Sequence, residues 1–346
     1  MSFEPQCLAT AIGSLPHADP SRACDVILEN IPEIPIWPQL PKTNFREEME
    51  IQYSEGLPCV VLDEARQKMH FETSGDSSRE LEKFYESYLA ANIEDFRITP
   101  AFSRGVYAMA DRLKEKKPDA LKLFKNQVTG PVTTALGRVD ENKRAIYYND
   151  VFRDVVVKGT EMKARWLLEK YRFLGCRQIC FIDEPILSAF GSSTFVSVQR
   201  ADVVQYLGDV VRVVQENGSL AGVHCCGNTE WTILVDSGVD IVSFDAYDFG
   251  ETIAYYPKPM AEFLERGGVL AWGIVPTSEK VRTEEPDSLV KKLGAAVDNL
   301  AGKGISESLI LDRCLVTPSC GTGSLSVELS EQIFNKLSKV SRLLRS

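Results

Sequence analysis

The sequence predicts a single α/β domain of the (β/α)8 (TIM) barrel class over residues 1–346. Two observations predict it. Short apolar runs typical of buried strands alternate with longer segments of helical periodicity, and eight such runs occur, nearly all followed by a helical pattern. No internal repeat or low-complexity linker divides the chain. An open dinucleotide-binding sheet is disfavoured, because the turn after the first run, Gly13–His17, has no G-x-G-x-x-G motif.

The expected elements follow in chain order from these patterns. The strands are expected at Cys7–Ile12, Ile34–Leu40, Phe124–Thr129, Gln178–Ile182, Leu220–Cys225, Asp240–Phe244, Val269–Ile274 and Arg313–Thr317. The clearest helices are expected at Asp19–Glu29, Ser78–Ile93, Asn149–Leu174, Val198–Asn217 and Val327–Leu344. Asp19-Pro20 combines an N-cap residue with a first-turn proline, and Gly175 and Gly218 are helix-ending glycines.

One insertion is expected after the second strand. Two short apolar runs between Gly56 and Thr73 flank Asp63–Arg66, which predicts an inserted β-hairpin. Residues 97–122 show no pattern that assigns a structure, and we expect them to lie near the barrel mouth.

Composition excludes several classes of function. Lys and Arg number 39 against 49 Asp and Glu, a net charge of −10, so we expect no binding to nucleic acid or to an anionic membrane. No apolar run approaches the roughly 20 residues that span a bilayer. The N-terminus lacks a secretory signal, and nine scattered cysteines argue against a disulfide framework. We expect a cytoplasmic protein with free thiols.

Residues suited to metal binding occur at the predicted strand ends, where the active site of such a barrel lies. Residues i and i+2 of a strand point to the same side, so His224 and Cys226 can bind one metal ion while Cys225 faces away. Asp245 and Cys320 follow later strands and can complete the site. Imidazole, thiolate and carboxylate together favour zinc.

Asp183 and Glu184 end the fourth predicted strand, and we expect both carboxylates to bind substrate. The thiolates limit what the metal can do. They donate negative charge, which weakens zinc as an acid toward water but leaves a zinc-bound substrate thiolate nucleophilic. The pattern therefore favours alkylation of a thiol over hydrolysis.

Six motifs occur in the same order as in a known family. They are Ala11–Pro16, Trp37–Pro41, Thr129–Thr133, Ile182–Pro185, His224-x-Cys226 and Pro318-x-Cys320-Gly321. With these motifs the chain resembles the C-terminal catalytic barrel of cobalamin-independent methionine synthase, in the superfamily that includes uroporphyrinogen decarboxylase. The resemblance covers nearly the whole chain.

The resemblance implies a zinc-dependent methyltransferase that converts homocysteine to methionine. The zinc ligands that it implies are His224, Cys226, Cys320 and, where the family has a Glu, Asp245. The homocysteine-binding residues that it implies are Gly13, Ser14 and Asp183, the last near the ammonium group.

Two departures from the family change the expected methyl donor. Thr134–Gly137 lacks the family's folate-packing Trp, and Trp272–Thr277 lacks the His that protonates the departing folate nitrogen. A corrinoid leaving group needs no such acid, so methylcobalamin or a methylated corrinoid protein is the expected donor. The alternatives are a related methyltransferase for another thiol, such as coenzyme M, and a non-catalytic corrinoid-protein-binding module. Uroporphyrinogen decarboxylation is disfavoured, since it needs no metal and requires a basic mouth.

Overall fold

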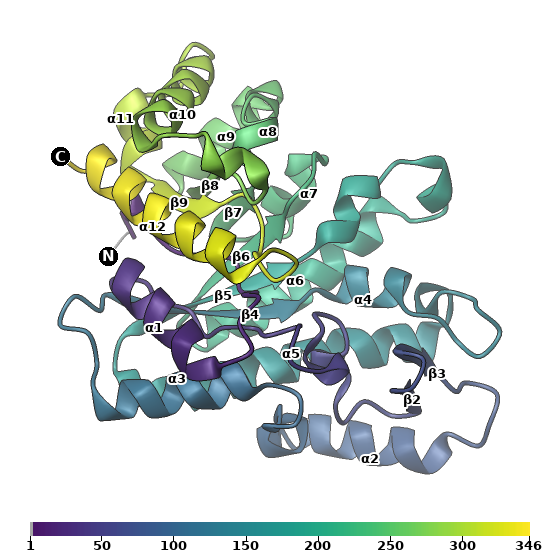
Figure 1. Cartoon of the computed structure of the whole chain (residues 1–346). Helices are drawn as coiled ribbons and strands as arrows, with labels where there is room; N and C mark the ends of the chain where they lie inside the picture. Colours follow the sequence, from purple (N-terminus) through teal and green to yellow (C-terminus); the bar gives the residue numbers. More distant parts are fainter. Residues whose placement is uncertain (1–2) are drawn as a thin grey trace.

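A curled parallel sheet of seven strands forms the centre of the molecule (Figure 1). The structure is a computed structural model and describes residues 3–346. The strands are β1 (Leu8–Ala9), β4 (Leu123–Thr129), β5 (Arg177–Asp183), β6 (Leu220–Cys225), β7 (Ile241–Phe244), β8 (Val269–Val275) and β9 (Cys314–Pro318). They lie in the order β1-β9-β8-β7-β6-β5-β4, so the first and last strands of the chain are neighbours.

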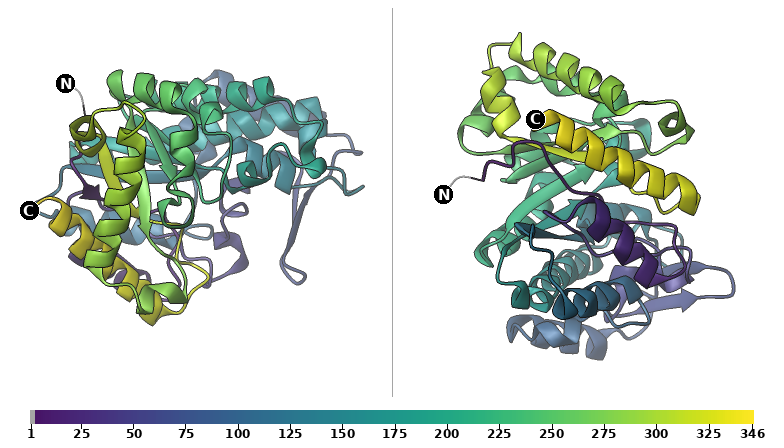
Figure 2. Two further views of the ribbon diagram at one scale, coloured as in Figure 1. Left: turned by 90° about the horizontal axis from the view of Figure 1, so that it is seen from above. Right: turned by 60° about the vertical axis from the view of Figure 1, so that its left-hand side comes forward.

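Helices lie around the outside of this sheet (Figures 1 and 2). They are α1 (Pro20–Asn30), α2 (Ser78–Leu89), α3 (Arg104–Glu115), α4 (Pro131–Gly137), α5 (Asp150–Lys170), α6 (Arg200–Glu216), α7 (Trp231–Asp236), α8 (Ala246–Phe249), α9 (Pro257–Glu265), α10 (Pro286–Ala301), α11 (Glu307–Asp312) and α12 (Val327–Leu344). As predicted, Asp19 caps α1 by accepting a hydrogen bond from Ser21 N. Within residues 3–346, no helix has the length and apolar character needed to cross a membrane.

The structure corrects the first two predicted strands. Only Leu8–Ala9 of the first forms a regular strand. Ile34–Leu40 forms isolated parallel bridges, Ile36 with Lys125 of β4 and Gln39 with Ser14. Prolines at positions 35 and 38 cannot donate to a ladder, which explains why pairing is confined to single residues. The fold is therefore α/β with seven regular parallel strands where eight were predicted.

The predicted hairpin is present, and a helix lies where none was assigned. Strands β2 (Val60–Asp63) and β3 (Lys68–Phe71) pair in antiparallel register, and Phe71 N donates to the Val139 carbonyl at 3.0 Å. The hairpin extends away from the central sheet (Figure 2). Residues 97–122 contain α3, which buries an apolar face.

Two apolar clusters follow from the alternation of side chains along each strand. The larger one lies between sheet and helices and includes Ile182 and Cys225. The smaller one includes Phe181 and draws on all seven parallel strands and on Ile34. Because neighbouring residues 181 and 182 belong to different clusters, Asp183 points to the same side as Phe181. The strand ends on that side carry the candidate site.

Candidate metal centre

Four polar residues lie side by side at the C-terminal edge of the sheet. Strand register pairs Thr129 of β4 with Asp183 of β5, Asp183 with His224 of β6, and His224 with Ser243 of β7. Neighbouring strands are about 4.8 Å apart, so the sheet brings these side chains together. Each of the four is buried.

His224 is oriented as a metal ligand. Its Nδ1 lies 3.0 Å from Ser243 Oγ, whereas its buried Nε2 has no hydrogen-bond partner among the described residues. When Nδ1 carries the proton and donates it to Ser243, Nε2 presents a lone pair. An imidazole held in this way by a second residue is the usual arrangement in protein metal sites.

Two thiols complete a group of three donors. The ligand atoms of His224, Cys226 and Cys320 all lie within 4.8 Å of one another. Cys320 comes from the loop after β9, so the donors converge from two separate strand ends. Contact with the Cys320 thiol, and secondly with His224, lowers the pKa of Cys226 to about 4. One imidazole and two thiols, one of them readily ionised, fit zinc.

Asp245, the fourth predicted ligand, lies outside this group of three. Its Oδ1 accepts a hydrogen bond from Asp248 N at 3.0 Å and caps α8. Burial raises the pKa of Asp245 to about 6, while the nearby His224 opposes that rise. Asp245 is thus close enough to feel the charge of the site, and its role as a ligand stays a prediction.

A cavity of about 250 Å³ opens onto the three donors. Ser14 and Asp183 line it together with His224, Cys226 and Cys320, whereas Gly13 is not among its lining residues. Asp183 is 8% exposed and its Oδ1 has no partner in the described chain. Burial raises the pKa of Asp183 to about 6, opposed by the charge of Lys125. An unpartnered carboxyl beside three metal donors is suited to binding a polar group of a ligand.

Glu184, predicted to bind substrate with Asp183, faces the other way. Its carboxylate accepts hydrogen bonds from Val132 N (2.9 Å), Thr133 N (2.7 Å) and Thr133 Oγ1 (2.6 Å), at the start of α4. A Cβ on Gly130 would lie 2.1 Å from this carboxylate, so glycine is needed there. Glu184 is fully buried and does not line the cavity. The structure therefore places it as an anchor between β5 and α4.

Two polar residues near the site were missed by the sequence analysis. One is Ser243, which orients His224. The other is Lys125, fully buried in β4, whose Nζ donates to the Ile12 carbonyl and lies 3.3 Å from Gln127 Oε1 and 4.5 Å from the centre of the Phe181 ring. Burial lowers the pKa of Lys125 to about 8, opposed by the charge of Asp183. The signal available was a lysine inside the apolar run of a central strand.

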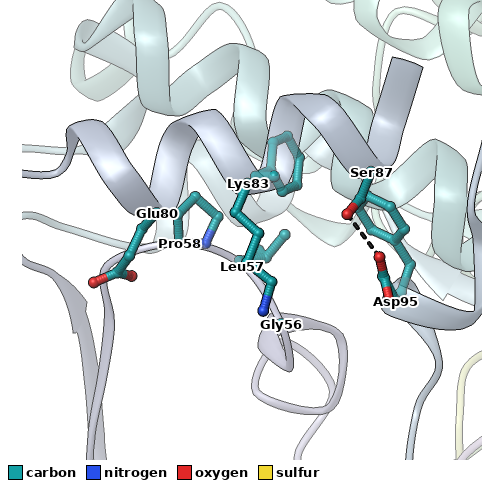
Figure 3. Close-up of a pocket in the computed structure, with 9 residues that line it drawn as sticks. Gly56, Leu57, Pro58, Glu80, Lys83, Ser87 and Asp95 are labelled. Carbon is teal, nitrogen blue, oxygen red and sulfur yellow. Dashed lines mark hydrogen bonds between the residues drawn. The ribbon is translucent and has the colours of Figure 1, made fainter. Parts of the chain in front are cut away.

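A second cavity, of about 240 Å³, lies between α2 and the loop at residues 56–58 (Figure 3). Its walls contain no histidine or cysteine. The two acids on its walls have partners: Glu80 accepts a hydrogen bond from Cys59 N, and Asp95 accepts one from Ser87. This cavity lacks the donors that distinguish the first one.

No family model matches the sequence, and no curated protein matches it. Among solved structures, the chain is similar to a modular endo-β-1,4-mannanase from Cellulomonas fimi, a protein of glycoside hydrolase family 26. The two are 13% identical, and the match covers 56% of this chain and 57% of the mannanase chain with a TM-score of 0.22. The match thus spans little more than half of the mannanase, and a likeness this weak carries no argument about activity.

Proposed function

We propose that this protein is a zinc-dependent methyltransferase that methylates the thiol of L-homocysteine to give methionine. The observation that carries the proposal is the convergence of His224, Cys226 and Cys320 within 4.8 Å, in a cavity that also contains the unpartnered carboxyl of Asp183. We propose Asp245 as a further ligand. The ion would lower the pKa of a bound substrate thiol, so that the thiol is held as a nucleophilic thiolate.

The remaining residues have separate parts in this proposal. Asp183, at the end of β5, binds the ammonium group of homocysteine, and Ser14, which follows β1, contacts the substrate from another wall of the same cavity. Ser243 holds His224 in the tautomer whose Nε2 is free for the metal. A carboxylate attracts an ammonium group and repels a sulfonate, which favours an amino-acid thiol over coenzyme M.

We propose methylcobalamin or a methylated corrinoid protein as the donor. In the transfer, the substrate sulfur forms a bond to the methyl carbon, and the corrinoid leaves with the electron pair of the cobalt–carbon bond. This leaving group needs no proton. Consistent with that, His224 is the single histidine among the lining residues of the cavity. His17 instead interacts with Glu331, and His70 lies in the hairpin strand β3.

For the fold, we propose a (β/α)8 barrel in which residues 34–40 occupy the position of the second strand. Two observations support it. Bridges of Ile36 to β4 and of Gln39 to Ser14 connect the two outer edges of the seven-stranded sheet. Ile34 also belongs to the smaller apolar cluster, which contains residues from all seven parallel strands.

The test is anaerobic methyl transfer by the zinc-loaded protein with homocysteine and free methylcobalamin, following the cobalamin spectrum and methionine. We expect methionine from the wild type and from Cys225→Ala, whose thiol faces the apolar core, but not from Cys320→Ser. Cys225→Ala is the matched control, because it removes a thiol that is adjacent to the site but is not one of the proposed metal ligands.

Other outcomes separate the alternatives. Turnover with coenzyme M but not with homocysteine would assign another thiol as substrate. Zinc and homocysteine binding without turnover, even with a methylated corrinoid protein, would indicate a binding module. Turnover that requires methyltetrahydrofolate would refute the proposed donor, and a wild-type protein without zinc would refute the proposal as a whole.

A further inference from the structure

The loop that carries Cys320 is attached on both sides. Toward β8, Ser319 N donates to the Val275 carbonyl at 2.8 Å, and Ser319 Oγ accepts from Thr277 N at 3.1 Å. These bonds hold the residue before Cys320. The residues after Cys320 are held by a separate set of contacts.

The other attachment is made mainly by Ser14, beside a hydrogen bond between Thr322 Oγ1 and Ser330 Oγ at 2.8 Å. The Ser14 carbonyl oxygen accepts hydrogen bonds from Thr322 N at 2.8 Å and from Thr322 Oγ1 at 2.9 Å. Its hydroxyl accepts one from Gly323 N at 3.1 Å. Ser14 thus contacts the two residues that follow Gly321, 308 and 309 positions away in the sequence. Cys320 is held between Ser319 on one side and Ser14 on the other.

Two glycines allow this close approach. A Cβ on Gly321 would lie 2.1 Å from Ser14 Oγ, whereas its next nearest atom, Ser14 Cβ, is 3.4 Å away. A Cβ on Gly323 would lie 2.8 Å from Pro41 Cγ and 2.9 Å from Ser14 Cβ. The Ser14 hydroxyl is therefore packed against the backbone of the residue next to Cys320.

We propose that Ser14 is a positioning residue for the metal: it sets the place of the Cys320 thiol relative to His224 and Cys226. This inference rests on the proposed metal site and adds a role to the predicted contact of Ser14 with substrate. It also explains the Gly321 position, since any side chain there displaces either Ser14 or the loop. The first motif, Ala11–Pro16, then contacts the last one, Pro318-x-Cys320-Gly321, and holds its cysteine in place.

The test compares Ser14→Ala, Gly321→Ala and the double variant by chelator competition for zinc. Gly321→Ala should weaken zinc binding about tenfold or more, because an overpacked contact must move the loop. Ser14→Ala should weaken it less, about fivefold, through the loss of one hydrogen bond. The double variant should return to the level of Ser14→Ala, because an alanine at position 14 has no Oγ for the new Cβ to meet.

Gly323→Ala is the matched control for this rescue. Its new Cβ meets Pro41 Cγ at 2.8 Å, Ser14 Cβ at 2.9 Å and Ser14 Oγ at 3.0 Å, and Ser14→Ala removes the last of these atoms but leaves the two nearer ones. Ser14→Ala should therefore fail to rescue Gly323→Ala. A second readout uses Co²⁺ in place of zinc. In Gly321→Ala, the sulfur-to-cobalt charge-transfer absorption of one of the two thiolates should be lost. If Ser14 only stabilised the fold, this absorption would stay unchanged.

The outcomes distinguish this inference from the proposed function. A wild type that binds zinc, with Ser14→Ala and Gly321→Ala of unchanged affinity and unchanged Co²⁺ spectra, would overturn the positioning role alone. Additive losses in the double variant would overturn it as well. A wild type that binds neither Zn²⁺ nor Co²⁺ would overturn both proposals.

Discussion

Ser243→Ala tests whether the metal site depends on a residue that touches no metal. Ser243 is fully buried, and its Oγ lies 3.0 Å from His224 Nδ1. With metal on Nε2, the proton must sit on Nδ1, where an alanine at position 243 offers no acceptor. A buried donor without a partner costs about 1–3 kcal/mol. The metal-free protein avoids this cost, because a neutral imidazole can move its proton to Nε2, where it faces the sulfur of Cys226.

The whole cost of Ser243→Ala should therefore fall on metal binding. We expect a zinc dissociation constant about tenfold to a hundredfold higher, the range known for such supporting residues, measured at pH 7 by competition with a chelator. Ser237→Ala is the control: it removes another buried serine hydroxyl, which donates to the Leu234 carbonyl at 2.7 Å, and should leave zinc affinity unchanged. A Ser243→Ala affinity within twofold of the wild type would refute the reasoning.

Three further predictions concern the anchor, a buried lysine and the cavity. Gly130→Ala places a Cβ 2.1 Å from the Glu184 carboxylate and should cost about 2 kcal/mol of stability; an unchanged midpoint of urea unfolding would contradict this. Lys163, fully buried, has a pKa lowered by burial from 10.5 to about 8. Between these two pH values Lys163 is protonated in the unfolded chain and neutral in the folded one. The free energy of unfolding therefore rises with pH in this range, by up to roughly 3 kcal/mol from this residue. Lys163→Met should remove that part of the slope, and a slope equal to that of the wild type from pH 8 to 10.5 would argue against it. Asp183→Asn should weaken homocysteine binding in calorimetry about tenfold or more while zinc binding stays intact; equal affinity would remove Asp183 from the substrate site.

Strand β6 and residues 34–40 show which part of the fold the sequence could predict. The expected range Leu220–Cys225 is the observed one, because a strand buried on both faces is apolar until its last residues. Residues 34–40 have the same apolar character, yet their pairing depends on which backbone groups can donate. A pattern of apolar residues does not show which backbone groups can donate. The prolines at positions 35 and 38 do show it, because they lack the backbone N–H, and they argue against a regular strand.

Helix α3 was missed although its signal is present. Its buried residues Val106, Met109, Ala110 and Leu113 follow the i, i+3, i+4, i+7 spacing of a helix face. Asp111 and Arg112 interrupt this pattern, and Gly105, which lies against the Pro38 carbonyl, precedes it. The glycine is therefore explained by a close contact between two segments. Taken locally, a glycine argues against a helix, and this hid the helical pattern.

The site was predictable from spacing within one strand and from the edge that parallel strand ends share, but not from the register between neighbouring strands. His224 and Cys226 share a side because they lie two positions apart. The same rule places Asp183 and Glu184 on opposite sides, as observed, so the two acids should have been given different roles. The contact of Ser243 with His224 depends on the register between β6 and β7, which no local pattern contains.

The pairing of β1 with β9 has a consequence for the order in which the chain folds. Leu8 pairs with Leu315, and Ser341 Oγ donates to the Cys7 carbonyl at 2.6 Å, so the last helix, α12, lies against the first strand. Contacts between such distant residues form slowly, because a long loop must close first. During synthesis, β1 stays without its neighbour until β9 has emerged. The candidate site, which needs Cys320, is thus assembled last, and a circular permutant that joined the two ends would convert this late contact into a local one.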